Sequence, residues 1–216
     1  KLDPKLQVTS FFKDGDFIKA GEVIAKGIGQ ARGILTAERV MLNILQHLCG
    51  IATATRQFVE LTKHTKAKIR DTRKTLPYLR ELQKYAVRVG GGENHRSSLS
   101  EMALIKDNHI ALCGGVKEAF EKIRSMYPNK IIEIECDTIE QVQEALSTGC
   151  DEILLDNMSI EMLKESVRLV NGKIKLEASG GISINTVKAV AETGVDYIAI
   201  GSLTHSVKAS DIGLDI

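Results

Sequence analysis

Cationic side chains gather in one part of the chain, close to residues that form turns. Between Lys66 and Lys106 there are ten lysines and arginines against four acidic residues, although the formal net charge of the chain is only +1. Arginine offers a planar fork to carboxylate or phosphate oxygens, whereas lysine is a point charge. Cations of both kinds beside exposed backbone indicate a small ligand with several anionic groups. The candidates at such positions are Arg73 and Lys74 in DTRKT, His95 and Arg96 after the three glycines, and Lys106 and His109 in KDNH.

Acidic residues form a second group. The segment from Glu133 to Asp156 carries eight acidic residues and no lysine or arginine. Much of that acidity belongs to solvated helix surface, but Glu135 and Asp156 end apolar runs that are typical of buried strands. Carboxylates at such positions usually bind a metal, a sugar hydroxyl or a partner cation. We therefore expect them beside a cation such as Mg²⁺, bridging phosphate and hydroxyl oxygens.

Two glycine-containing segments are suited to phosphate. Ser179-Gly180-Gly181 leads into a predicted helix, so its backbone N–H groups could cradle a phosphate beside the helix N-terminus. Gly201-Ser202 follows the next predicted strand, where barrels often place a phosphate site. A single glycine is more often a simple turn, but two such segments at consecutive strand ends favour phosphate binding.

Strand-like and helix-like runs alternate from residue 130 onward. The strand-like runs end at Glu135, Asp156, Ser179 and Gly201, with spacings of 21, 23 and 22 residues. Amphipathic runs lie between them, and their predicted N-caps are Thr138, Ser159 and Ser183. This alternation predicts parallel strands with right-handed crossovers. Further strands are expected near Ile69, Val87 and Leu104.

The resulting fold class is α/β, with about seven parallel strands. An open doubly wound sheet and a barrel both fit this pattern. An incomplete barrel is favoured, because functional-looking residues follow almost every strand, whereas an open sheet would concentrate them at one switch point.

The first 36 residues differ from the rest. Short alternating apolar stretches broken by glycines predict two or three short strands. A lipoyl- or biotinyl-carrier module is a weaker alternative, because no modifiable lysine stands at a hairpin tip. A long helix with Thr36 as N-cap is expected next, interrupted at Gly50. Arg39 on this helix is either solvated or functional, and the residues alone leave both open.

Composition bounds the remaining possibilities. A chain of 216 residues with 43% hydrophobic and 26% charged residues is typical of a globular protein. We find no run long enough to span a membrane and no signal peptide at the start. Near-neutral charge and the lack of tryptophan give no support to nucleic-acid binding. The cysteines form no CxxC pair and are interpreted as reduced thiols in the cytoplasm: Cys49, Cys113, Cys136 and Cys150. The remaining histidines are interpreted as surface or packing residues: His47, His64 and His205.

The motifs DTRKT, GGGENHR, LIKDNHI, IEIE, LLDN, EASGGI and DYIAIGSLTHS together resemble the quinolinate phosphoribosyltransferase family of type II phosphoribosyltransferases. The resemblance extends over effectively the whole chain. It implies a small α/β open-faced sandwich domain, N-terminally truncated, at residues 1–50 with 203–216. It also implies a barrel domain at residues 51–202 that carries the active site. The family has a leading segment that would precede Lys1.

The resemblance implies a pentosyltransferase of NAD biosynthesis. In that reaction the ring nitrogen of quinolinate attacks C1 of phosphoribosyl pyrophosphate and expels pyrophosphate. Loss of the 2-carboxylate as CO₂ then gives nicotinate mononucleotide. The implied cofactor is Mg²⁺, and the implied assembly is a homodimer or a higher homo-oligomer with shared active sites.

The resemblance also assigns residues. Quinolinate would be bound by Arg73, His95, Arg96 and Lys106, with Arg39 contributed by a neighbouring subunit. Phosphoribosyl pyrophosphate would be bound by Lys74, Glu135, Asp156, Ser179, Gly180, Gly181, Gly201 and Ser202. The expected catalytic residues are Lys74, Lys106, Glu135 and Asp156. Glu135 and Asp156 would also hold Mg²⁺, directly or through water or substrate.

Three rivals remain. The nearest is a related phosphoribosyltransferase acting on nicotinate or another aromatic acid, although a monocarboxylate would need fewer cations than this sequence offers. A Schiff-base aldolase barrel with Lys106 as nucleophile is the second. A non-catalytic carrier or binding module built on the first 36 residues is the third.

Overall fold

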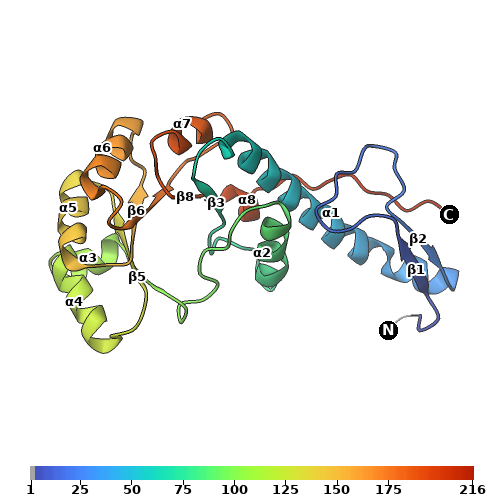
Figure 1. Cartoon of the computed structure of the whole chain (residues 1–216). Coiled ribbons are helices and arrows are strands. Elements are labelled where there is room, and N and C mark those ends of the chain that lie inside the picture. Colours follow the sequence, from blue (N-terminus) through green and yellow to red (C-terminus); the bar gives the residue numbers. More distant parts are fainter. Residues whose placement is uncertain (1–2) are drawn as a thin grey trace.

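The computed structural model describes residues 3–216 and contains two sheets joined by one long helix. Six parallel strands form the larger sheet, and two antiparallel strands form the smaller one. The helix α1 (Ala31–Thr62) runs between them, and the C-terminus lies beside the smaller sheet (Figure 1). Within residues 3–216, no helix is long and apolar enough to cross a membrane.

The larger sheet has the strand order β3-β8-β7-β6-β5-β4, so β3 and β4 are its edges. Its strands are β3 (Lys68–Arg70), β4 (Ala103–Ile105), β5 (Ile132–Cys136), β6 (Glu152–Asp156), β7 (Lys175–Ser179) and β8 (Tyr197–Ala199). The strands expected near Ile69 and Leu104 and the four runs after residue 130 are confirmed as parallel strands. These elements place the carboxyl ends of all six strands at one edge of the sheet.

The prediction of a seventh strand near Val87 is wrong. Val87 lies in the helix α2 (Arg80–Val89). The buried residues of this helix are Gln83 and Lys84 and, three residues further on, Ala86 and Val87. Buried positions that repeat after three residues are typical of a helix and not of a strand. The chain then touches β3 at a single parallel bridge, between Glu93 and Arg70.

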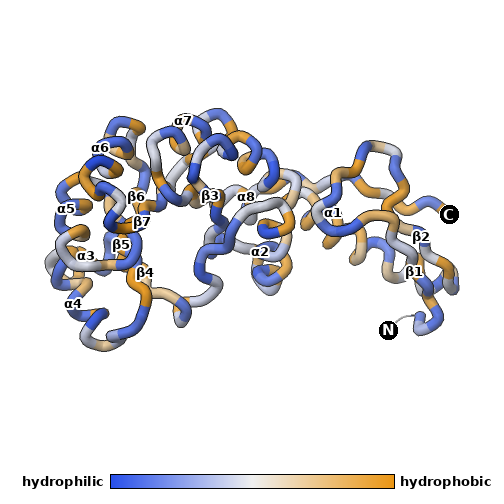
Figure 2. The backbone as a smooth tube through the Cα atoms, in the orientation of Figure 1, coloured by the Kyte–Doolittle hydropathy of each residue, from blue (hydrophilic) through white to orange (hydrophobic). Residues whose placement is uncertain are grey.

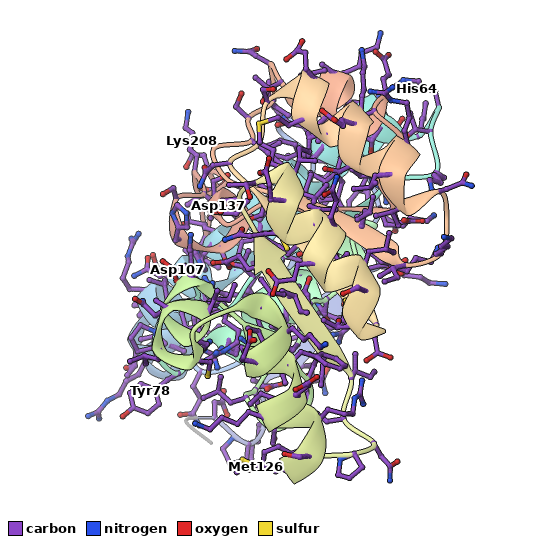
Figure 3. All side chains as sticks on the ribbon, turned by 90° about the vertical axis from the view of Figure 1, so that its left-hand side faces the viewer. His64, Tyr78, Asp107, Met126, Asp137 and Lys208 are labelled. Carbon is purple, nitrogen blue, oxygen red and sulfur yellow. The ribbon has the colours of Figure 1, made fainter. Side chains whose placement is uncertain are left out.

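The remaining helices follow the strands. They are α3 (Asp107–Cys113), α4 (Val116–Met126), α5 (Ile139–Thr148), α6 (Ile160–Val170), α7 (Val187–Ala191) and α8 (Ser202–His205). Thr138 and Ser159 cap α5 and α6 as predicted, each accepting a backbone N–H with its hydroxyl. Ser183 does not cap a helix, because α7 begins only at Val187 after an intervening turn. Helices α4, α5 and α6 lie one above another across the outside of the sheet (Figure 3).

The two faces of the larger sheet differ in chemistry. Along β5, Ile132, Ile134 and Cys136 point outward and are fully buried in the apolar core under the helices. The alternate residues, Glu133 and Glu135, point to the other face. That inner face is polar, unlike the doubly apolar strands that the sequence pattern suggested.

The N-terminal part is a hairpin-like pair on the long helix. β1 (Gln7–Ser10) pairs antiparallel with β2 (Ala25–Ile28), which confirms the strand pair expected in the first 36 residues. Apolar side chains here are largely exposed, including Phe17 at 84% and Val40 at 66%. Figure 2 shows the corresponding orange stretches around the hairpin and along α1.

Two expectations about α1 are wrong. The helix begins at Ala31, so Thr36 lies inside it and donates its hydroxyl to the carbonyl of Arg32. Gly50 does not interrupt the helix. It is buried, and a Cβ there would collide with the carbonyl oxygen of Lys208. Glycine at this position therefore lets the C-terminal segment cross α1 closely.

Candidate active site

The carboxyl ends of the strands bring the predicted residues to one rim. Asp156 and Ser179 are partners in the register of β6 and β7, and the Asn157 N–H donates to the Ser179 carbonyl at 2.9 Å. Figure 3 places Asp107, which follows β4, and Asp137, which follows β5, on the same side of the molecule. The rim therefore includes both the cationic and the acidic groups identified in the sequence.

Lys106 and Glu135 form an ion pair on adjacent strands. Their side chains are 45% and 15% exposed, so the pair opens to solvent on the lysine side. Lys106 also precedes α3, where its backbone N–H donates to Nδ1 of His109 at 2.9 Å. His109 thus stabilises the start of α3.

Lys74 lies in the loop after β3, and its side chain reaches Gly201, which follows β8. The position of a Cβ on Gly201 is 3.3 Å from Cδ of Lys74 and 3.2 Å from Nε2 of His205. The Thr204 hydroxyl donates to the Lys74 carbonyl at 2.8 Å, which ties the DTRKT loop to α8. His205, interpreted from sequence as a surface or packing residue, therefore belongs to this rim. Its position in the short helix directly after Gly201-Ser202 was the available signal.

Arg73 and Arg96 lie close enough for their charges to interact. Burial lowers the pKa of Arg96 below its usual value, and the positive charge of Arg73 lowers it further. Arg96 donates through Nη1 to the Met102 carbonyl at 2.9 Å, and Nε of Arg73 is buried without a hydrogen-bond partner among the described residues. Two guanidinium groups held near one another provide a site that an anion would stabilise.

Asp71 anchors the loop that carries His95 and Arg96. Its carboxylate accepts the His95 N–H at 2.9 Å, the Asn94 side-chain amide at 2.5 Å and the Lys84 ammonium at 2.5 Å. Lys84 also donates to the His95 carbonyl at 2.8 Å. Burial raises the pKa of Asp71 above its usual value, and the hydrogen bonds oppose that rise.

The three glycines before this loop have a packing role. A Cβ on Gly90 would lie 2.5 Å from the Ala52 carbonyl oxygen, and one on Gly92 would lie 2.9 Å from both Thr55 and Val87. Only glycine allows the loop to pack this closely against α1. This contact and the Asp71 hydrogen bonds together restrain the loop that carries His95 and Arg96.

The inner face of the sheet holds a buried ionic cluster beneath the rim. Nε2 of His95 lies 2.9 Å from Oε2 of Glu133 and 3.5 Å from Oε1 of Glu177. Nη1 of Arg70 lies 2.8 Å from both Glu177 and Glu152, and its guanidinium stacks on the ring of Tyr197. Arg70 on β3 thus reaches carboxylates on β6 and β7, so the inner face of the sheet is concave.

Burial dominates the protonation of this cluster. It raises the pKa of Glu177 to about 7, and the nearby charge of Glu133 acts in the same direction. Burial lowers the pKa of His95, but Glu133 and Glu177 outweigh it and raise that pKa overall. Glu152 and Glu177 raise the pKa of Arg70 against the effect of burial. Within this cluster, Glu177 is therefore the carboxyl group that titrates near neutral pH.

Sequence reasoning missed Glu133 and Glu177. Each stands two residues before a predicted strand-end residue, Glu135 and Ser179 respectively, so each shares the inward face with it. His95, Glu133 and Glu177 each contribute one nitrogen or oxygen atom that could bind a metal, and these three atoms lie within 4.8 Å of one another. We interpret this group as an ion-pair cluster, because the Arg70 guanidinium already supplies the positive charge beside Glu177.

The predicted phosphate loop is only partly as expected. Gly180 and Gly181 have φ values of 95° and 61°, and a Cβ on Gly180 would collide with the Asn157 side chain. The expectation that this loop leads directly into a helix is wrong, because α7 starts at Val187. The loop instead covers a cavity of about 230 Å³ between α6 and α7.

Arg39 does not lie at the rim of its own subunit. Its side chain is 73% exposed and pairs with the adjacent Glu38. The N-terminal end of α1, which carries Arg39, lies beside the hairpin and away from the larger sheet (Figure 1).

Fold and site together define an α/β protein with cationic and acidic side chains at the carboxyl ends of a parallel sheet. A family model described as the C-terminal domain of quinolinate phosphoribosyl transferase matches residues 51–215, and the corresponding N-terminal domain model matches residues 2–49. The chain belongs to the quinolinate phosphoribosyltransferase family.

Individual relatives agree. The chain is 48% identical to the nicotinate-nucleotide pyrophosphorylase (carboxylating) of Mycobacterium leprae, over 94% of this chain and 73% of that protein. It is 43% identical to quinolinate phosphoribosyltransferase (decarboxylating) 2b of Nicotiana tabacum, over 100% of this chain and 66% of that one. A crystal structure of nicotinate-nucleotide pyrophosphorylase from Ehrlichia chaffeensis superposes with a TM-score of 0.95 at 50% identity, covering 97% of this chain and 77% of that chain.

Proposed function

We propose that this chain transfers the phosphoribosyl group of phosphoribosyl pyrophosphate to quinolinate, with loss of CO₂, to give nicotinate mononucleotide. The observation that carries the proposal is the position of Arg96, whose charge interacts with that of Arg73 and with that of Glu135 in the Lys106–Glu135 ion pair. The names of the relatives, nicotinate-nucleotide pyrophosphorylase and quinolinate phosphoribosyltransferase, point to the same reaction.

Quinolinate would bind at the cationic end of the rim. Arg73 and Arg96 can each offer a guanidinium to a carboxylate, and Lys106 adds a third positive charge. A dicarboxylate balances two of these three positive charges, whereas nicotinate, with one carboxylate, balances only one. The crowded cations therefore favour quinolinate over the monocarboxylate rival.

Phosphoribosyl pyrophosphate would bind along β5 to β8. Lys74 and the loops 179–181 and 201–202 would hold its phosphates, and Glu135 and Asp156 would face its ribose hydroxyls. The two carboxylates are hard oxygen donors at the rim, which fits Mg²⁺ held directly or through water or substrate. When bound, Mg²⁺ would supply charge neutralisation for the departing pyrophosphate.

Catalysis would then be positioning and electrostatics. Glu135 and Asp156 would stabilise the positive charge that develops on the ribose, and Lys74 and Lys106 would stabilise the anionic groups. Ribosylation makes the ring nitrogen cationic, so the substrate supplies its own electron sink for decarboxylation. A Schiff-base aldolase needs a free amine, whereas Lys106 is paired with Glu135.

Arg39 would act in the site of a neighbouring subunit, in a homodimer or a higher homo-oligomer. Its 73% exposure supports this role, as do the exposed apolar side chains that follow it on α1: Val40, Met41 and Ile44. A guanidinium on an apolar exposed helix face is suited to a subunit interface.

The sheet would form an incomplete barrel at residues 51–202, and residues 1–50 with 203–216 would form the small domain. Arg70 reaching across to Glu152 supports the curvature of the barrel. The hydrogen bond from the Ser210 N–H to the Gln46 carbonyl supports grouping the C-terminus with α1. Residues 1 and 2 lie outside the described residues. Four free cysteines support a cytoplasmic location.

The direct test is to incubate the protein with quinolinate, phosphoribosyl pyrophosphate and Mg²⁺ and to follow nicotinate mononucleotide and CO₂ together. Equal amounts of both products are expected. Product formation from nicotinate without CO₂, and none from quinolinate, would contradict the proposal and favour the nearest rival.

A further inference from the structure

The imidazole of His95 is held at both nitrogens by the protein itself. Nε2 lies 2.9 Å from Oε2 of Glu133, and Nδ1 accepts the backbone N–H of Arg96 at 2.8 Å. A nitrogen that accepts a hydrogen bond must be unprotonated, so in the neutral ring, above the folded pKa of His95, the proton belongs on Nε2. A carboxylate can only accept, so Glu133 selects this tautomer.

We propose that Glu133 is a positioning residue that fixes His95 as the Nε2–H tautomer and thereby holds the backbone of Arg96 at the substrate rim. The consequence for catalysis rests on the function proposed above, whereas the tautomer itself does not. Glu133 would act through His95 and Arg96 and would not touch the substrate.

Arg96 needs such a restraint because its neighbour repels it. The charges of Arg73 and Arg96 repel each other, and among the described residues the side chain of Arg96 forms one hydrogen bond, from Nη1 to the Met102 carbonyl. Without a bound anion, repulsion would turn the guanidinium away from Arg73. A backbone fixed at His95 holds the Arg96 guanidinium near its binding position, so the side chain loses less conformational freedom when the ligand binds.

Geometry assigns this role to Glu133 among the charged groups around the ring. Glu177 is farther away, at 3.5 Å, and its other oxygen is bonded to Arg70. Asp71 and Lys84 contact the backbone N–H and carbonyl of His95 and not the ring. Glu152 is bonded to Arg70 on the same inner face and serves as the matched control.

The tautomer can be read directly by ¹⁵N NMR of the histidine-labelled full chain. Wild type is expected to show His95 as Nε2–H, and Glu133→Met is expected to broaden or shift that signal, whereas Glu152→Met leaves it in place. An Nδ1–H tautomer in wild type would overturn the proposal. This measurement needs no turnover, so it remains decisive even if the chain does not use quinolinate.

Kinetics test the consequence. Glu133→Met is expected to raise KM for quinolinate about tenfold, while KM for phosphoribosyl pyrophosphate changes by less than about twofold. Glu133→Gln keeps an acceptor oxygen and is expected to show a smaller increase, which serves as the readout if Glu133→Met does not fold. If Glu133→Met raises KM for both substrates by the same factor, and by no more than Glu152→Met does, the role of Glu133 is only structural.

Replacing the ring itself separates positioning from substrate contact. Asparagine places an acceptor near the Nδ1 position, and glutamine places its amide near the Nε2 position. Each amide therefore keeps one of the two contacts of the ring, and both His95→Asn and His95→Gln are expected to retain more quinolinate binding than His95→Ala. If both lose as much binding as His95→Ala, the two ring contacts do not position Arg96 and the proposal is overturned.

Discussion

Lys84 and Asp71 form an ion pair that is almost completely removed from water, with side chains 2% and 0% exposed. The pair joins α2 to the end of β3 directly beneath the loop that carries His95 and Arg96. Because the pair also contacts the N–H and carbonyl of His95, it couples the packing of α2 to the position of the substrate rim.

We expect Lys84→Met to destabilise the protein by about 3–5 kcal/mol, because it leaves the Asp71 carboxylate buried without its cation. Urea unfolding followed by circular dichroism would measure the change. Lys63→Met is the matched control, since Lys63 forms an exposed ion pair with Glu60. That control should change the free energy of unfolding by less than about 1 kcal/mol. Equal effects of the two variants would contradict the structural role of the buried pair.

Stability should fall as the pH rises from about 4.5 to just above 7. The pKa of Glu177 is raised from 4.5 to about 7 in the folded chain, and that of His95 is raised from 6.5. Both groups bind protons more tightly when folded, so their contribution is fully present at low pH and is lost as the pH passes the folded values. For Glu177 the loss is at most on the order of 3 kcal/mol.

Glu177→Gln should flatten this dependence, because the amide does not titrate. Thermal unfolding of both proteins between pH 5 and pH 8, at constant ionic strength, provides the measurement. A wild-type stability that rises over this interval would show that the cluster is not protonated in the way described.

The sequence predicted the strand ends well and the inner face poorly. Repeating spacing located Glu135, Asp156, Ser179 and Gly201, because each ends a short apolar run before an amphipathic helix. Glu133 and Glu177 were missed because an isolated acidic residue in a strand is indistinguishable from a solvated one until its partners are known. Their partners, Arg70 and His95, come from distant parts of the chain.

The Val87 error has a related cause. VRV is predicted as a strand on β propensity alone, but packing of the buried residues of α2 against α1 and α8 selects the helix. The predicted N-cap of α1 was wrong for a different reason. Thr36 has the chemistry of a cap, but the helix continues back to Ala31, where no side-chain cap exists.

Arg96→Ala should weaken quinolinate binding about a hundredfold and phosphoribosyl pyrophosphate binding much less. It removes one guanidinium that can form a paired hydrogen bond with a carboxylate. Isothermal titration with each substrate alone provides the comparison. Arg56→Ala, at an exposed position on α1, should leave both affinities unchanged. Equal losses for the two substrates would refute the assignment of Arg96 to quinolinate.

Asp156→Ala should impair turnover and binding of the sugar phosphate more than binding of quinolinate. The carboxylate ends β6 beside Ser179, where the ribose and Mg²⁺ are proposed to lie. We expect kcat to fall about 100-fold, as for loss of one electrostatic contact in a transition state. Chelation of Mg²⁺ should abolish turnover in wild type. Glu165→Ala on the exposed side of α6 is the control, and an unchanged kcat in Asp156→Ala would rule out the proposed role.

Gly180→Ala should damage the phosphate end of the rim through two separable effects. Its φ of 95° is unfavourable for alanine, and the new Cβ would collide with the side chain of Asn157 at the end of β6. Gly149→Ala isolates the first effect, because Gly149 also has a positive φ, of 77°, but meets nothing within 4 Å. We expect Gly149→Ala to cost about 1–2 kcal/mol of stability and to leave both KM values unchanged.

Gly180→Ala should cost more and should raise KM for phosphoribosyl pyrophosphate, because relieving the collision moves the Ser179–Gly181 backbone. If the two variants lose equal stability and neither changes that KM, the loop has no part in phosphate binding.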